Sequence, residues 1–178
     1  ASATFFVLGN RVDNFPNIIQ REYSQGHEIG SHSFSHPQIT TLTSEEIEYQ
    51  FTETEHRIQQ YVPYTTKLIR PPYGQITQSL KEVLQKTFVL WSIDTQDWKT
   101  RDKDAIVSEV LNNVKDGDII LMHDMYSTTA DACEELIPAL IERGYQLVTV
   151  SELLNAKEIT PVAGSVYSRV LSTGNAAS

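Results

Sequence analysis

The regular alternation of short apolar runs with amphipathic segments constrains the fold of this chain more than any other feature. Repeated strand–helix alternation favours an α/β fold built on parallel strands. Six strands fit either a barrel or an open sheet with helices on both faces. The runs that we interpret as strands are residues 3–8, 27–32, 67–70, 88–94, 118–123 and 146–150.

The segments between these runs carry helical patterns. The clearest covers residues 44–61, where apolar positions recur at steps of three and four and a capping box of Thr43 and Glu46 precedes them. Further helices are predicted over 104–114 and 130–143. Residues 157–178 show weak periodicity, so we predict one domain over 1–156 and a C-terminal tail over 157–178 that wraps the domain and ends in disorder.

Composition excludes several classes of function. The 178 residues carry a net charge of −9, which disfavours nucleic acid as a partner because such binding needs Lys and Arg to neutralise phosphates. No apolar run is long enough to span a membrane, and no glycine-rich phosphate loop follows a strand. Cys133 is the only cysteine, so no intrachain disulfide can form, and we interpret it as core packing. A neutral sugar polymer is compatible with this charge.

Four of the predicted strands end in a polar side chain. His32, Arg70, Asp94 and His123 each stand at the end of a different strand. In parallel α/β barrels the carboxyl ends of the strands carry the active site. The sequence therefore predicts that two imidazoles, a guanidinium and a carboxylate gather at one rim.

The segment H-S-F-S-H places His32 and His36 four residues apart. In a helical turn both imidazoles would face one ion, and zinc is the usual divalent metal for such ligands. Ser33 stands where a zinc protease of the H-E-x-x-H type needs glutamate, so that class is excluded. The alternative is a hydrogen-bonded surface pair at a strand exit.

The segment R-P-P-Y-G, beginning at Arg70, predicts a stiff loop because its prolines fix φ and its glycine permits an unusual turn. Such a loop can hold a backbone N–H in place, as an oxyanion hole requires. Arg70 could orient a carboxylate through two hydrogen bonds. The alternative is a rigid turn in which Arg70 makes a structural salt bridge.

Two further segments, D-T-Q-D-W from Asp94 and L-M-H-D around His123, follow consecutive strands. We predict that Asp97 and His123 are in contact, because a strand–helix–strand unit brings adjacent strand ends together. A histidine paired with a carboxylate can act as a general acid, whereas a lone histidine there is more often structural. Trp98 either stacks on a sugar or is half-buried at a helix start.

Read together and in this order, the four segments resemble motifs two to five of the polysaccharide deacetylase family, also called the NodB-homology domain or carbohydrate esterase family four. The resemblance covers about residues 1–155 and is similar in look to bacterial peptidoglycan N-acetylglucosamine deacetylases. It implies a distorted seven-stranded, TIM-like (β/α) barrel, of which this chain supplies six strands. It also implies a metal-dependent hydrolase located outside the bacterial cell or on its surface.

The chain departs from the family pattern at the first motif. That motif, T-F-D-D-G, supplies the catalytic base and a third metal ligand in the family, and no such segment occurs in these residues. The chain opens directly into a strand-like run. We therefore expect a docked N-terminal fragment of the same protein that carries the Asp-Asp pair and completes the barrel; a truncated chain is the competing explanation.

The resemblance assigns a role to each matching residue near the reacting amide. His32 and His36 would hold one divalent ion with the absent aspartate, zinc being the first choice and cobalt, manganese or nickel the others. Arg70 would hold the absent base in place. The backbone N–H of Tyr73 would stabilise the oxyanion.

The remaining assignments concern the leaving group and the substrate. His123 would protonate the sugar amine, Asp97 would keep His123 charged, and Trp98 and Leu121 would line the sugar and acetyl pocket. The polymer would be a cell-wall polysaccharide, peptidoglycan first. Acetylxylan esterase and chitin or poly-glucosamine deacetylase stay open, as does a non-catalytic carbohydrate-binding barrel.

Overall fold

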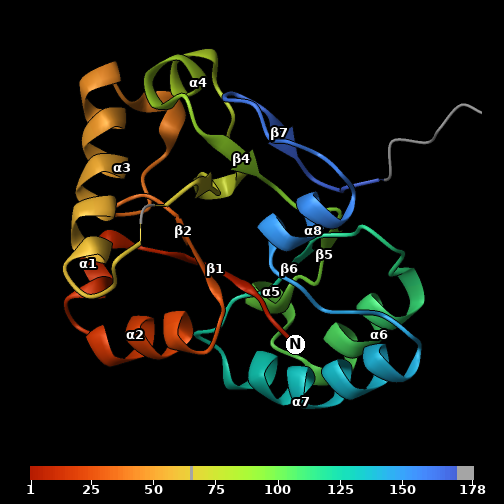
Figure 1. Ribbon diagram of the computed structural model, residues 1–178. Coiled ribbons are helices and arrows are strands. Elements are labelled where there is room, and N and C mark those ends of the chain that lie inside the picture. The colour runs from red at the N-terminus through yellow and green to blue at the C-terminus, as the bar shows by residue number, and fades with distance from the viewer. Residues whose placement is uncertain (65, 172–178) are drawn as a thin grey trace, which may run out of the picture. The chain divides into compact units, whose positions relative to one another are not determined.

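The computed structural model describes residues 1–64 and 66–171 (Figure 1). They form two compact units. The first unit comprises Ser2–Leu90 together with Thr160–Tyr167, and the second unit comprises Trp91–Ile159 together with the segment that begins at Ser168.

The first unit is built on a parallel sheet. Its strand order is β1-β2-β3-β4-β7, and every neighbouring pair is parallel. The first four strands lie side by side in sequence order, so their carboxyl ends share one edge of the sheet. The strands are β1 (Thr4–Val7), β2 (Glu28–Ser31), β3 (Leu68–Ile69), β4 (Thr87–Val89) and β7 (Val166–Tyr167).

Helices connect these strands and cover the sheet. α1 (Gly9–Val12) and α2 (Pro16–Ser24) join β1 to β2, α3 (Ser44–Gln59) lies between β2 and β3, and α4 (Gln78–Leu84) precedes β4. Single 3-10 turns span Ile39–Thr41 and Pro72–Gly74. The predicted capping box of α3 is confirmed, and the helix buries Ile47, Phe51, Thr54 and Ile58.

The second unit pairs two short strands with a layer of helices. β5 (Ile93–Asp94) and β6 (Ile120–Leu121) are parallel, with Asp94 opposite Leu121. α5 (Asp97–Thr100) follows β5 directly, and α6 (Lys103–Asn113) packs against α7 (Ser127–Glu142); α8 (Val150–Ala156) ends the unit's helical part. The core between them consists of Ile93, Ile106, Val107, Val110, Ala132, Leu136 and Leu140.

The α/β class and the parallel strands are confirmed, but two strand predictions are wrong. The run 88–94 is two strands, β4 and β5, which belong to different sheets. The run 146–150 is not a strand, because Thr149 caps α8 through a capping box with Glu152 and Val150 is already helical. The predicted tail contributes β7, which pairs with β4. The disorder predicted at the end of the tail falls on residues 172–178, outside the described residues.

No helix within residues 1–64 and 66–171 has both the length and the apolar character needed to cross a bilayer.

Gly117 offers a test of how the second unit holds the segment around Val170. Gly117 has φ +87, and a Cβ there would lie 1.9 Å from the Val170 carbonyl oxygen. Gly117→Ala is expected to lower the free energy of unfolding by more than the about 1–2 kcal/mol that left-handed backbone costs. Gly144→Ala is the control in chemical denaturation, because Gly144 has φ +86 with nothing within 4 Å. Equal losses in the two variants would show that the Val170 contact does not matter.

Candidate active-site residues in the two units

The H-S-F-S-H segment follows β2 and brings two imidazoles together. The ring centroids of His32 and His36 are 4.9 Å apart, with the planes at 65°. The predicted helical turn is wrong, because Ser33 (φ 75) and His36 (φ 60) are left-handed. Non-glycine residues adopt this conformation at a cost that surrounding contacts must offset, and such residues cluster at functional sites.

Those surrounding contacts come largely from α3. The Gln50 side-chain oxygen accepts the backbone N–H groups of Phe34 and Ser35, each at 2.9 Å. Inside the turn, the His36 N–H donates to the buried hydroxyl of Ser33 at 3.0 Å. The turn that carries the two histidines is therefore fixed by side-chain hydrogen bonds, and sequence analysis did not single out Gln50.

The orientation of His32 suits a metal ligand. Its Nδ1 lies 2.5 Å from the Arg70 carbonyl oxygen. A carbonyl can only accept, so we assign the proton to Nδ1, which places the lone pair of the neutral ring on Nε2. Metal-binding histidines commonly donate their other N–H to a backbone carbonyl in this way.

The two histidines do not make a complete metal site by themselves. Among residues 1–64 and 66–171, no group of three or more His, Cys, Asp or Glu side chains is placed to hold a metal ion. His32 and His36 fit the imidazole part of a divalent-metal site, and a further ligand would have to join them.

Arg70 is buried where β3 ends. Its Nε donates to the Val89 carbonyl at 3.3 Å and its Nη2 to the Leu90 carbonyl at 3.1 Å, and the guanidinium lies 4.4 Å from the centre of the Phe6 ring. Burial lowers the pKa of Arg70 to about 10, so the group remains charged at neutral pH. These contacts fix the position of the guanidinium.

Tyr73 lies in the loop after Arg70 and has an unusual backbone. Its φ is 57, and Gly74 follows with φ 66. The Tyr73 side chain is 60% exposed, and its ring lies 4.7 Å from the His36 ring in an edge-on arrangement. The predicted stiff loop therefore lies beside the histidine pair within the first unit.

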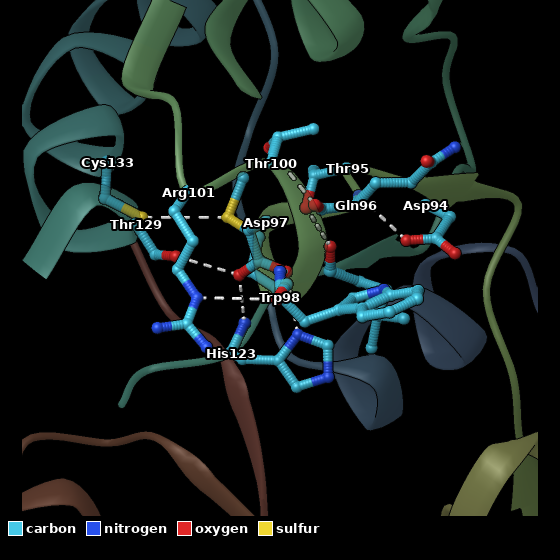
Figure 2. A network of polar contacts seen from close by, with 12 residues as sticks. Asp94, Thr95, Gln96, Asp97, Trp98, Thr100, Arg101, His123, Thr129 and Cys133 are labelled. Carbon is cyan, nitrogen blue, oxygen red and sulfur yellow. Dashed lines mark hydrogen bonds and ion pairs between the residues drawn. The ribbon is translucent and has the colours of Figure 1, made fainter. Parts of the chain in front are cut away.

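The second unit contains the predicted pair of Asp97 and His123 (Figure 2). His123 Nδ1 lies 2.7 Å from Asp97 Oδ1, and the His123 backbone N–H donates to Oδ2 at 2.6 Å. The predicted contact is confirmed. The Asp97 side chain is 0% exposed, whereas that of His123 is 35% exposed, so the histidine reaches solvent and the carboxylate behind it does not.

Hydrogen bonds keep the buried carboxylate ionised. Burial alone would raise the pKa of Asp97, but hydrogen bonds from the His123 ring, the His123 backbone and the Thr129 hydroxyl outweigh it, and the pKa lies below its usual value. An ionised Asp97 can only accept, so we assign the proton of this hydrogen bond to His123 Nδ1, which leaves Nε2 as the other ring nitrogen.

The other predicted residues of the second unit lie nearby in sequence and differ in exposure. Trp98 follows Asp97 and is 48% exposed, while Leu121 is buried on β6. The Leu121 carbonyl accepts a hydrogen bond from the Thr95 hydroxyl at 2.9 Å, which ties the end of β5 to β6. Burial raises the pKa of the Cys133 thiol, which agrees with a packing role.

Known proteins are similar to this chain in sequence. Residues 1–89 match the model of the polysaccharide deacetylase family. The chain is 45% identical over 156 residues to the peptidoglycan-N-acetylmuramic acid deacetylase PdaC of Bacillus subtilis (strain 168), covering 88% of this chain and 33% of that protein. It is 38% identical over 155 residues to the peptidoglycan-N-acetylglucosamine deacetylase PgdA of Listeria monocytogenes (serotype 1/2a, strain 10403S), covering 87% and 33%.

Solved structures are similar over most of the chain. The structure of PdaC from Bacillus subtilis has a TM-score of 0.87 and 44% identity, covering 89% of this chain and 78% of that one. A family 4 acetyl xylan esterase from Clostridium thermocellum, in complex with a cobalt ion, has a TM-score of 0.90 and 34% identity, covering 95% and 85%.

The parallel α/β architecture and these identities define a domain of the carbohydrate-esterase class. Within that class, the chain belongs to the polysaccharide deacetylase family. It spans about a third of the length of the two curated relatives named above.

Proposed function

We propose that the protein is a metal-dependent hydrolase that removes N-acetyl groups from N-acetylglucosamine residues of a cell-wall polysaccharide, peptidoglycan first. The observation that carries this proposal is the buried Asp97 carboxylate bonded to a partly exposed His123. That pair suits a proton donor for a leaving amine. The curated relatives that are named peptidoglycan deacetylases support the choice of polymer.

The metal-binding part of the proposal rests on the turn after β2. His32 and His36 would hold one divalent ion, zinc first, with cobalt, manganese and nickel as alternatives; the cobalt ion in the Clostridium thermocellum relative supports a divalent ion of this kind. Such an ion activates a water molecule by lowering its pKa toward about 7. The third ligand and the base would come from the family's T-F-D-D-G segment, which is not among these 178 residues.

The other residues act on the base, the oxyanion and the substrate. The fixed guanidinium of Arg70 would orient the base carboxylate, and the Tyr73 backbone N–H would donate to the developing oxyanion. His123 would donate the proton on Nε2 to the leaving amine while Asp97 favours the protonated ring. Trp98 and Leu121 would line the pocket for the sugar and its acetyl group.

The barrel architecture and the location of the protein complete the proposal. Family membership supports assigning the strands to the distorted seven-stranded (β/α) barrel. Peptidoglycan lies outside the cytoplasmic membrane, so the protein would act outside the bacterial cell or on its surface.

Acetate release from defined polymers tests the proposed reaction. When the T-F-D-D-G segment (the acidic segment) is supplied, the protein should release acetate from peptidoglycan and from a chito-oligomer. A preference for acetylated xylan would favour the ester-hydrolysing alternative, which the Clostridium thermocellum relative supports. Tight binding of these polymers without acetate release from any of them would favour a non-catalytic carbohydrate-binding module.

Removal of the two histidines should abolish metal binding. The His32→Ala, His36→Ala double variant is expected to lose the roughly one divalent ion per chain that a single such site holds, because both imidazole ligands are gone. Elemental analysis after dialysis of protein refolded with the T-F-D-D-G segment measures the ion, and His56→Ala is the control because that side chain is 62% exposed on α3. Stoichiometric metal in the double variant would place the site elsewhere.

A further inference from the structure

Thr129 makes a contact with the Asp97–His123 pair that the proposed reaction has not used. Its hydroxyl donates to Asp97 Oδ2 at 2.8 Å, and both side chains are buried (Figure 2). Thr129 lies in the first turn of α7, whereas Asp97 begins α5 and His123 follows β6. The hydroxyl therefore links the carboxylate to a third element of the second unit.

The donors around Asp97 divide between its two oxygens. Oδ1 accepts from the His123 ring at 2.7 Å and from the Trp98 backbone N–H at 2.9 Å. Oδ2 accepts from the His123 backbone N–H at 2.6 Å and from the Thr129 hydroxyl. Among these donors, the Thr129 hydroxyl is the one that comes from a side chain other than His123, so it fixes the rotation of the carboxylate independently of the histidine.

We propose that Thr129 is a positioning residue for the general acid: its hydroxyl holds the Asp97 carboxylate so that Oδ1 faces the Nδ1–H of His123. A carboxylate held in this way keeps the ring in one orientation and one tautomer, with Nε2 left to carry the transferable proton. The role in catalysis rests on the proposed function, whereas the positioning of Asp97 does not.

The same hydroxyl favours the ionised form of Asp97, because it donates a hydrogen bond to the charged group. The other titratable group that acts on this carboxylate is His123, and the carboxylate in turn raises the pKa of Cys133, one turn further along α7. Removing the Thr129 hydroxyl should therefore raise the pKa of Asp97 toward its usual value. Neither of the other two groups changes in that substitution.

Thr128 provides a matched control in the same turn of α7. Its hydroxyl oxygen is buried and has no hydrogen-bond partner among the described residues. Thr128→Val thus makes the same chemical change next to Thr129 without removing a hydrogen bond. If Thr129 served only to start the helix, Thr129→Val and Thr128→Val would have the same effect on the titration of Asp97.

The decisive measurement is the titration of the Asp97 carboxyl carbon by NMR in the folded chain. Thr129→Val should raise the midpoint by about one pH unit, a tenfold change in proton affinity, as expected for loss of one hydrogen bond to a charged group. Thr129→Ser should titrate as the wild type, and Thr128→Val should leave the midpoint unchanged. Thr129→Ala gives the same measurement should the valine variant fail to fold.

Activity adds a second readout. In protein with the acidic segment supplied, Thr129→Val should lower kcat by about 10-fold and move the acid limb of the pH profile upward, while Thr129→Ser restores both. An Asp97 midpoint that stays in place in both Thr129→Val and Thr129→Ala would overturn the positioning role. Wild-type protein that releases no acetate, while the Asp97 midpoint still moves in Thr129→Val, would instead reject the proposed function and leave the positioning of Asp97 standing.

Discussion

Replacing His123 by alanine is expected to lower kcat by about 10²–10⁴-fold, the range that general acid catalysis typically contributes. The ring is the partly exposed member of the pair, and its Nδ1 is engaged by Asp97, so Nε2 is the nitrogen that can donate to a leaving amine. Alanine removes that donor, and no neighbouring group of the pair can replace it because Asp97 is fully buried.

The substitution should act on the chemical step alone. In protein with the T-F-D-D-G segment supplied, steady-state acetate release from a chito-oligomer measures kcat, and elemental analysis should show unchanged metal content because His32 and His36 are untouched. His56→Ala, which removes an exposed histidine from α3, should keep full activity. A kcat within a few-fold of wild type in His123→Ala would leave His123 with a structural role.

Sequence reasoning placed the polar residues at the carboxyl ends of parallel strands. His32 and Arg70 follow β2 and β3 of one sheet, whereas Asp94 ends β5 and His123 follows β6 of the other sheet. The same reasoning placed Asp97 against His123, and the 2.7 Å contact bears this out. It located His32 and His36 beside one another for an incorrect reason. The rings meet because Ser33 and His36 adopt left-handed backbone conformations. The segment contains no glycine that would have indicated this conformation.

The boundary between β4 and β5 could not be predicted from the run V-L-W-S-I, since it contains neither glycine nor proline. Tertiary contacts separate β4 from β5. The Ser92 hydroxyl donates to Asp118 at 2.7 Å, and the Ser92 N–H donates to the Ile119 carbonyl. The start of α8 differs, because the sequence does carry a local signal there: Thr149 and Glu152 form the T-x-x-E pattern of a capping box at the end of the apolar run 146–150.

Gln50 and Thr129 were missed for a reason that is common to both. Gln50 bonds a turn 15 residues before it, and Thr129 bonds a carboxylate 32 residues before it. Each is an ordinary polar residue on a helix until the fold brings its partner close. A single sequence carries no signal for such contacts, which is why the residues that support the site are harder to find than those that end the strands.

Asp97→Asn is expected to weaken both the acid and the fold. The neutral side chain keeps the shape of Asp97 but removes the charge that favours a protonated His123. A pair of unit charges at 4 Å contributes about 1 kcal/mol in water and about 4 kcal/mol at an effective dielectric of 20. Loss of that attraction for the imidazolium should lower kcat by roughly 5-fold to 10³-fold, which acetate release measures.

The substitution should also destabilise the fold, because every group that forms a hydrogen bond with Asp97 is a donor. An asparagine must turn its NH₂ either toward the Thr129 hydroxyl and His123 N–H or toward the Trp98 N–H and the His123 ring. A buried donor that loses its acceptor costs about 1–3 kcal/mol, so the free energy of unfolding at neutral pH should fall by that amount. Thermal or chemical denaturation measures the loss.

The pH dependence of stability separates charge from shape. Because the pKa of Asp97 is lowered in the folded protein, its contribution is present above the usual carboxyl value of about 3.9 and is lost as pH falls through the lower folded value. The stability difference between wild type and Asp97→Asn should therefore be largest near neutral pH and shrink in acid. A difference that is constant from pH 7 to pH 2, with an unchanged kcat, would mean that the Asp97 charge supports neither His123 nor the fold.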